Sequence, residues 1–223
     1  MSKFNIIPIY QDMLWCKTPE QQQQVGYFED CFSITEHQNI LPYICSQIDP
    51  IIYMKINSNV NTTMHNVLLV FFGCFAPFHE GHMNAITLSK KHFISRGFNV
   101  LGCVLFQSHD EYILTKKHIT PTNIRKFSDL NKRYLNDKQV YVDTFSNLLR
   151  GELNFPYLLL RCLSYIKEYK NTKLGVIVGE DNRGFSFIEH DKIEFSVISR
   201  SDPLLNDKYD ISSTKYRETK NDY

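Results

Sequence analysis

The sequence predicts an α/β protein in which helices flank a parallel β-sheet, preceded by an N-terminal extension. Two observations carry this prediction. From Val67 onward, short continuous runs of apolar residues alternate with longer segments whose apolar residues recur at helical spacing. Continuous apolar runs are typical of strands buried on both faces of a parallel sheet. With 223 residues, 43% of them hydrophobic, the chain is long enough for one α/β domain and an appendage.

The individual elements follow from these runs in order. Five runs are predicted as strands, and they cover residues 67–72, 99–106, 139–145, 173–179 and 193–199. Three intervening segments are predicted as helices, and they cover residues 82–95, 120–135 and 155–170. Helices of this length between strands favour right-handed crossovers and therefore a parallel sheet. Ligands of such sheets bind at the carboxyl ends of the strands, where the strand order reverses.

Residues 1–65 are predicted as an N-terminal extension of unknown role, and residues 66–223 as the main domain. The extension contains four successive glutamines at residues 21–24, and residues 58–66 have the polar composition of a linker. Two roles are compatible with this composition. The extension is either a layer packed on the main domain or an arm that binds a partner or regulates.

Charge and cysteine content narrow the class of protein. A formal net charge of +1 and a pI of about 7.6 give no reason to expect a nucleic-acid or membrane partner. No run approaches the roughly 18 consecutive apolar residues of a membrane helix, and the first residues lack the pattern of a secretory signal. The six cysteines are scattered, without a C-x-x-C pair. Several of them stand in apolar runs, so we expect a cytoplasmic protein whose cysteines are reduced thiols of the core.

A first candidate site lies in the segment FFGCFAPFHEGHMNAI, residues 71–86. Gly73 ends the first predicted strand and lets a ligand approach the backbone, and Gly81 permits a tight turn between two histidines. These histidines, His79 and His82, lie at the start of the first predicted helix, where N–H groups and the helix dipole attract an anion. Two imidazoles there can donate hydrogen bonds to phosphate oxygens, so the pattern predicts a phosphate site.

A metal site fits the same segment less well. Glu80 is its only carboxylate, and Cys74 is expected to point into the sheet. We therefore assign no protein side chain as a metal ligand.

A second candidate site lies near the C-terminus, in the segment ISSTKYR at residues 211–217. Its three hydroxyl residues are good N-cap residues for a helix that carries Lys215 and Arg217. Hydroxyls, helix N–H groups and a guanidinium would converge there on a triphosphate. The alternative is an ordinary helix cap.

Together the two segments resemble the signatures of the HxGH nucleotidyltransferase superfamily. The pattern G-x-F-x-P-x-H-x-G-H spans Gly73 to His82, and I-S-S-T-x-x-R spans Ile211 to Arg217. Within this superfamily the chain is most similar to nicotinamide or nicotinate mononucleotide adenylyltransferases. Further segments that fit in the expected order are residues 107–118, 142–148 and 178–187. The resemblance covers roughly residues 67–217 and implies a Rossmann-like nucleotidyltransferase fold.

The resemblance implies a reaction between ATP, accompanied by Mg²⁺, and a mononucleotide that carries a phosphate. That phosphate attacks the α-phosphorus of ATP, and pyrophosphate leaves. The residues implied to carry catalysis are His79, His82 and Arg217. Those implied to bind ATP are Gly73, Cys74, Phe75, Gly81, His82, Gly179, Asp181, Ile211, Ser212, Ser213, Thr214 and Arg217. Those implied to bind the mononucleotide are Phe75, Ser108, Tyr112, Lys116, Arg125, Phe145 and Arg200.

The chain also departs from the family pattern. Phe145 and Ser146 stand where the family has Trp and Glu, and only six residues follow Arg217. Phe145 can still stack on a pyridine ring as the family's tryptophan does. Two alternatives therefore stay open. One is another HxGH enzyme, acting with CTP on a phospho-alcohol or with ATP on phosphopantetheine, and the other is an inactive nucleotide sensor. A homo-oligomer is compatible with either.

Overall fold

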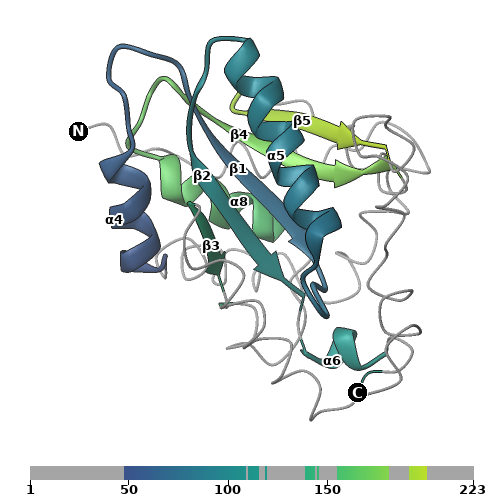
Figure 1. Cartoon of the computed structure of the whole chain (residues 1–223). Helices are drawn as coiled ribbons and strands as arrows, with labels where there is room; N and C mark the ends of the chain where they lie inside the picture. Colours follow the sequence, from purple (N-terminus) through teal and green to yellow (C-terminus); the bar gives the residue numbers. More distant parts are fainter. Residues whose placement is uncertain are drawn as a thin grey trace, which may run out of the picture.

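A computed structural model describes residues 48–108, 110–115, 119, 139–143, 145, 155–180 and 191–199. It contains a five-stranded, wholly parallel sheet with helices on both faces (Figure 1). The strands are β1 (Asn66–Gly73), β2 (Asn99–Gln107), β3 (Val140–Asp143), β4 (Thr172–Gly179) and β5 (Ile193–Ile198). The predicted fold class, a Rossmann-like parallel sheet flanked by helices, is confirmed.

The order of the strands reverses beside β1. The sheet runs β3-β2-β1-β4-β5, so the chain builds outward from β1 to β3 and then returns to the other side of β1. The β1–β2 ladder continues to the pair Gly73 and Gln107, whereas the β1–β4 ladder ends at Phe71 and Ile177. The carboxyl ends of β1 and β4 therefore lie at the position where ligands of such sheets bind.

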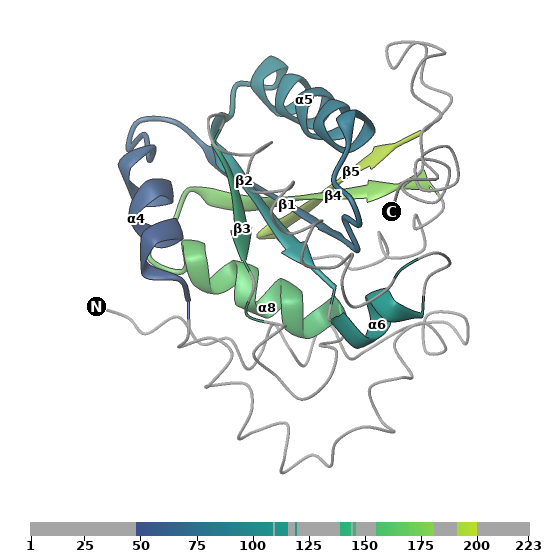
Figure 2. The ribbon, with the colours of Figure 1, turned by 60° about the horizontal axis from the view of Figure 1, so that its bottom comes forward.

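Helix α5 (Glu80–Ser95) covers one face of the sheet (Figure 2). Its buried residues include Ile86 and Phe93, which pack with Val67 and Leu69 of β1. Gly175 of β4 makes this close approach possible, because a Cβ there would lie 2.7 Å from atoms of Leu69 and Phe93. The helix thus has a fixed height over β1 and β4.

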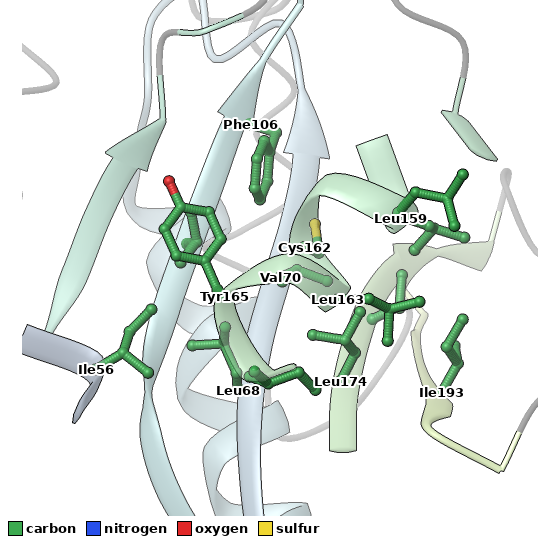
Figure 3. Packing of buried hydrophobic residues seen from close by; sticks show 14 of the residues in the cluster. Ile56, Leu68, Val70, Phe106, Leu159, Cys162, Leu163, Tyr165, Leu174 and Ile193 are labelled. Atoms are coloured by element: carbon green, nitrogen blue, oxygen red, sulfur yellow. The ribbon is translucent and has the colours of Figure 1, made fainter. Parts of the chain in front are cut away.

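The opposite face is covered by α8 (Phe155–Ile166) and α4 (Pro50–Ser58) (Figures 2 and 3). Leu159 and Leu163 of α8 are buried against Leu68 and Val70 of β1. Burying a leucine side chain contributes about 1.5–3 kcal/mol relative to leaving it exposed. The alternating residues of β1 therefore serve two cores, one on each face, as expected for a strand buried on both sides.

Helix α4 was not predicted, although its start carries a clear signal. The Asp49 carboxylate accepts hydrogen bonds from the N–H groups of Ile51 (2.8 Å) and Ile52 (3.1 Å), and Pro50 occupies the first turn. Ile52 and Ile56, four residues apart, are buried in the same core as α8. This part of the N-terminal segment therefore packs directly on the sheet.

The predicted elements otherwise match the structure with small shifts in their ends. Helix α5 begins two residues earlier than predicted, and α8 ends four residues earlier. A short helix, α6 (Asp110–Leu114), follows β2 and was not predicted. The predicted helix at residues 120–135 lies outside the described residues. No helix in the described part of the chain is long and apolar enough to cross a membrane.

Two of the cysteines are core thiols, as predicted. Cys103 and Cys162 are unpaired and fully buried, and Cys74 is half-buried. Burial raises the pKa of the Cys103 thiol to about 12 and that of the Cys162 thiol well above its ordinary value. Both side chains are therefore neutral at physiological pH.

Candidate functional site

The turn from β1 into α5 is built around Phe75. Its backbone has φ of +43°, a conformation that is strained for a bulky residue, and its ring is buried. The ring lies over Gly73, where an added Cβ would meet it at 3.2 Å. The Gly73 carbonyl in turn accepts a hydrogen bond of 3.0 Å from the backbone N–H of Ser108. This arrangement ties the turn to the loop that follows β2.

His82 is held at the start of α5 by its own helix cap. Its Nδ1 accepts a hydrogen bond of 3.2 Å from the backbone N–H of His79. A nitrogen that accepts carries no proton, so this bond selects the neutral tautomer with the proton on Nε2. His82 therefore has a hydrogen-bond donor at Nε2 without taking up a proton.

Aromatic rings fix the plane of the His82 imidazole. The rings of Phe71 and Phe75 meet it edge-on, with centroids at 5.9 and 5.1 Å, and the Phe78 ring is tilted to it at 5.2 Å. The His79 imidazole stacks on it, with centroids 3.8 Å apart. Side chains this closely packed leave the imidazole little rotational freedom, so its donor is preorganised.

His79 is the N-cap residue of α5 and is itself buried. Its carbonyl accepts hydrogen bonds from the N–H groups of His82 (3.0 Å) and Met83 (3.3 Å). The N–H groups of Glu80 and Gly81 precede these in the first turn, where the positive end of the helix dipole lies. Because two charged imidazoles in stacked contact would repel one another, this pair is suited to carry at most one positive charge.

One predicted ATP-binding residue outside this turn lies at the same edge of the sheet. Gly179 ends β4, two residues beyond the last β1–β4 pair. The expectation that Cys74 points into the sheet is wrong, because its side chain packs beside Ala76 and Ile113, and its Sγ lies 3.9 Å from the Ser108 hydroxyl. Asp181 and residues 211–217, which include Ser212, Ser213, Thr214 and Arg217, lie outside the described residues.

Only some of the residues predicted to bind the mononucleotide lie in the described part of the chain. Ser108 follows β2 and is bonded to Gly73, and Tyr112 of α6 is exposed. Phe145 is buried beyond the end of β3, and the Arg161 guanidinium lies over its ring at 4.0 Å from the centroid. Stacking of this ring on a pyridine stays a prediction. Three other predicted residues lie outside the described residues, and they are Lys116, Arg125 and Arg200.

A comparison with protein families decides the class of the chain. The family described as cytidylyltransferase-like matches residues 70–219, about two thirds of the chain. The chain belongs to this family. The match begins within β1 and ends beyond Arg217, so it includes both motifs. The predicted membership of the HxGH nucleotidyltransferase superfamily is thereby confirmed, and the chain is a nucleotidyltransferase-type protein.

Solved structures that are similar to this chain include three whose descriptions name adenylyltransferases. One is a protein from Vibrio parahaemolyticus assigned as a nicotinate-nucleotide adenylyltransferase, with 15% identity, a TM-score of 0.43 and coverage of 69% of this chain and 80% of that chain. The others are the Plasmodium falciparum nicotinic acid mononucleotide adenylyltransferase complexed with NaAD and with APC, with 12% and 13% identity. Both have a TM-score of 0.41, covering 69% of this chain and 71% of theirs. No curated protein sequence shows significant similarity to the chain.

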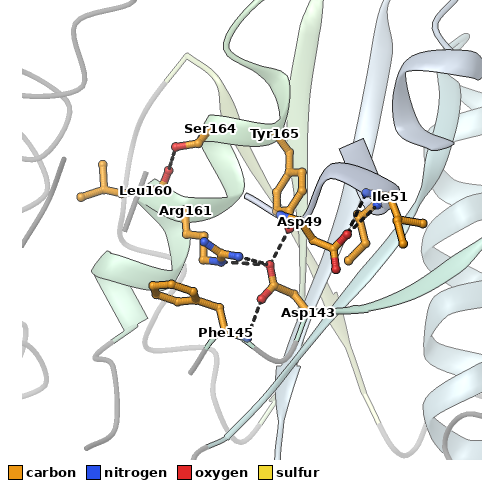
Figure 4. A network of polar contacts seen from close by, with 9 residues as sticks. Asp49, Ile51, Asp143, Phe145, Leu160, Arg161, Ser164 and Tyr165 are labelled. Carbon is orange, nitrogen blue, oxygen red and sulfur yellow. Dashed lines mark hydrogen bonds and ion pairs between the residues drawn. The ribbon is translucent and has the colours of Figure 1, made fainter. Parts of the chain in front are cut away.

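Sequence reasoning missed a buried polar cluster at the carboxyl end of β3 (Figure 4). Asp143 and Arg161, each 2% exposed, form an ion pair in which Oδ2 lies 2.9 Å from both Nε and a terminal nitrogen of the guanidinium. The Tyr165 hydroxyl donates to the same Oδ2 at 2.6 Å. Burial and the Asp143 charge raise the pKa of Tyr165, so its hydroxyl stays a donor. The available signal was the one charged residue, Arg161, in the otherwise apolar segment FPYLLLRCLSYI.

Proposed function

We propose that this nucleotidyltransferase is an ATP-dependent adenylyltransferase that joins AMP to nicotinamide or nicotinate mononucleotide. The products are NAD or deamido-NAD, together with pyrophosphate. The observation that carries the proposal is the preorganised His82, whose Nε2 donor stands at the N-terminus of α5 beside the reversal of strand order. A donor and a helix N-terminus at this position suit a nucleotide phosphate.

In the proposed reaction an oxygen of the mononucleotide phosphate attacks the α-phosphorus of ATP and forms a new P–O bond. The bond between the α-phosphorus and the oxygen that bridges to the β-phosphorus breaks, and pyrophosphate leaves with the electron pair. The nucleophile is already an anion at neutral pH, so the reaction requires no general base. Catalysis then consists of positioning the two phosphates and stabilising the charge that develops between them.

His82 is proposed to donate its Nε2–H to an oxygen of the α-phosphate. The neutral tautomer can do this directly, whereas a proton on Nδ1 would break the bond from the His79 backbone. By the resemblance, Arg217 holds the β- and γ-phosphates, and Ser212, Ser213 and Thr214 add hydrogen bonds.

Mg²⁺ is proposed to enter with ATP. In the described part of the chain, no three His, Cys, Asp or Glu side chains gather as metal ligands. The ion would be held mostly by phosphate oxygens and water, which suits its preference for oxygen ligands and retained waters. It would neutralise triphosphate charge, while the protein residues position the α-phosphate.

A second candidate is transfer of CMP from CTP to a phospho-alcohol. The description of the matching family as cytidylyltransferase-like favours it. The same histidine pair would serve both reactions, because each breaks the same bond of a nucleoside triphosphate. The two candidates differ in the base and in the acceptor, so substrates discriminate between them.

Pyrophosphate release by the purified full chain tests the proposal. Reactions contain Mg-ATP with either nicotinamide or nicotinate mononucleotide, or Mg-CTP with phosphocholine. We expect release with ATP and at least one pyridine mononucleotide, and a loss of about 10²–10³ in kcat for His82→Ala. His92→Ala is the matched control, because His92 is an exposed histidine in the last turn of the same helix. Silence with both pyridine mononucleotides, while calorimetry confirms ATP binding, would refute the proposal, and release with CTP alone would favour the second candidate.

A further inference from the structure

The buried cluster at the end of β3 connects three separate segments of backbone (Figure 4). The Asp143 carboxylate accepts through Oδ1 from the backbone N–H of Phe145 at 2.9 Å, and through Oδ2 from Arg161 and Tyr165. The Tyr165 hydroxyl accepts in turn from the backbone N–H of Asp49 at 3.0 Å. The cluster therefore links the start of α4, the middle of α8 and the residues that follow β3.

A gain in the stability of the folded state does not by itself explain why this cluster is polar. Taking an ion pair out of water is costly, and apolar side chains of similar volume in its place often leave a protein equally stable. Apolar side chains in place of Asp143 and Tyr165 would remove the acceptors of the hydrogen bonds from the N–H groups of Phe145 and Asp49. What the polar residues add is the fixed position of these two backbone segments.

Phe145 is held by this cluster in two ways. Asp143 Oδ1 holds its backbone, and Asp143 Oδ2 holds the Arg161 guanidinium that lies over its ring at 4.0 Å. A guanidinium stacked on an aromatic face is attracted by the ring's quadrupole, and the attraction grows when both are shielded from water. Phe145 is 5% exposed, so its ring has one defined setting rather than a range of rotamers.

We infer that Asp143, Arg161 and Tyr165 form a positioning unit that holds the Phe145 ring in its orientation for mononucleotide binding. The same unit connects Phe145 to the start of α4. The inference rests on the proposed function and on the resemblance, which implies that Phe145 contacts the mononucleotide. The three residues touch no substrate and act through Phe145. A change in the unit should therefore weaken the binding of the mononucleotide and leave the binding of ATP, at the His79–His82 turn, unchanged.

Tyr165→Phe is the mildest test, because it removes one hydroxyl and keeps the ring. Ser164→Ala is the matched control, since Ser164 directly precedes Tyr165 in α8, is equally buried and donates to the Leu160 carbonyl at 3.0 Å, outside the unit. Amide hydrogen exchange measured by NMR on ¹⁵N-labelled full chain gives a structural readout. We expect the Phe145 and Asp49 amides to exchange about tenfold faster in Tyr165→Phe and to change little in Ser164→Ala.

Steady-state kinetics gives the functional readout. We expect the KM for the mononucleotide to rise about three- to tenfold in Tyr165→Phe, with the KM for ATP within about twofold of wild type. Equal amide exchange in the two variants, or parallel rises of both KM values, would overturn the inference. If the wild-type chain turns over neither mononucleotide, the proposed function and the mononucleotide role fail together, while amide exchange still decides whether the unit positions Phe145.

Discussion

Replacing Asp143 with asparagine isolates the energetic weight of the buried ion pair. The change removes the negative charge that pairs with the Arg161 guanidinium, which is 2% exposed. Arginine does not release its proton in proteins, so it cannot escape by becoming neutral. If the asparagine oxygen faces Arg161, its NH₂ group faces the N–H of Phe145, and two donors then oppose each other. We expect the free energy of unfolding to fall by about 3–5 kcal/mol.

Replacing Arg161, the other partner of the ion pair, should lower the free energy of unfolding by less. In Arg161→Met the carboxylate keeps its hydrogen bonds from Phe145 and Tyr165, and it can also take up a proton. We expect a loss of about 1–3 kcal/mol for this variant. The double variant Asp143→Leu/Arg161→Met, which buries no charge, should be more stable than Asp143→Asn.

Urea denaturation followed by far-ultraviolet circular dichroism measures all three variants on one scale. The predicted order of stability places wild type above Arg161→Met, with Asp143→Asn lowest. A loss below about 1 kcal/mol for Asp143→Asn, or a larger loss for Arg161→Met, would show that the pair is not the desolvated ion pair described above.

The remaining predictions concern the sheet and its buried thiols. Gly175→Ala places a Cβ 2.7 Å from Leu69 and Phe93, so thermal denaturation should show a loss of about 1–3 kcal/mol, and an unchanged melting temperature would refute the close packing of α5. Burial raises the pKa of Cys103 from 9.0 to about 12, so between these pH values the folded state keeps a proton that the unfolded state releases. Stability should therefore fall as pH rises through this window, by up to about 1.4 kcal/mol per pH unit for this thiol, and Cys103→Ala should flatten the slope.

The sheet was predictable because its information is local. Each strand is a short apolar run, and a continuous run such as residues 67–72 indicates burial on both faces without knowledge of any partner. The first histidine site was predictable for a similar reason, since His79, Gly81 and His82 fall between a strand and a helix. This pattern predicted that the site lies at the start of the first helix, beyond the end of the first strand.

Other features depend on contacts that the sequence does not display. The tautomer of His82 is set by a backbone N–H three residues earlier, and that bond exists only once the turn is formed. Arg161 finds Asp143 eighteen residues away along the chain, across the crossover between β3 and α8. The Asp49 N–H reaches Tyr165 over 116 residues. Such partners are decided by the packing of α4 and α8 on one face of the sheet.

Helix α4 is a different case, because its signals are local and were overlooked. Asp49 followed by Pro50 is a common helix start, and Ile52 and Ile56 have helical spacing. Residues 58–66, which follow this short segment, have the polar composition of a linker, and the segment was not predicted as a helix. Its burial against the sheet also explains how a contact from α4 can reach the end of β3.

Product analysis tests the central claim most directly. The full chain is incubated with Mg-ATP labelled at the α-phosphorus and, in separate reactions, with each pyridine mononucleotide, and the products are separated and identified by mass spectrometry. The account predicts that the label appears in NAD or deamido-NAD, and that the initial rate of this transfer falls by about 10²–10³ in His82→Ala while His92→Ala retains it. Label that stays in ATP with both mononucleotides, under conditions where the wild-type chain binds ATP, would contradict it.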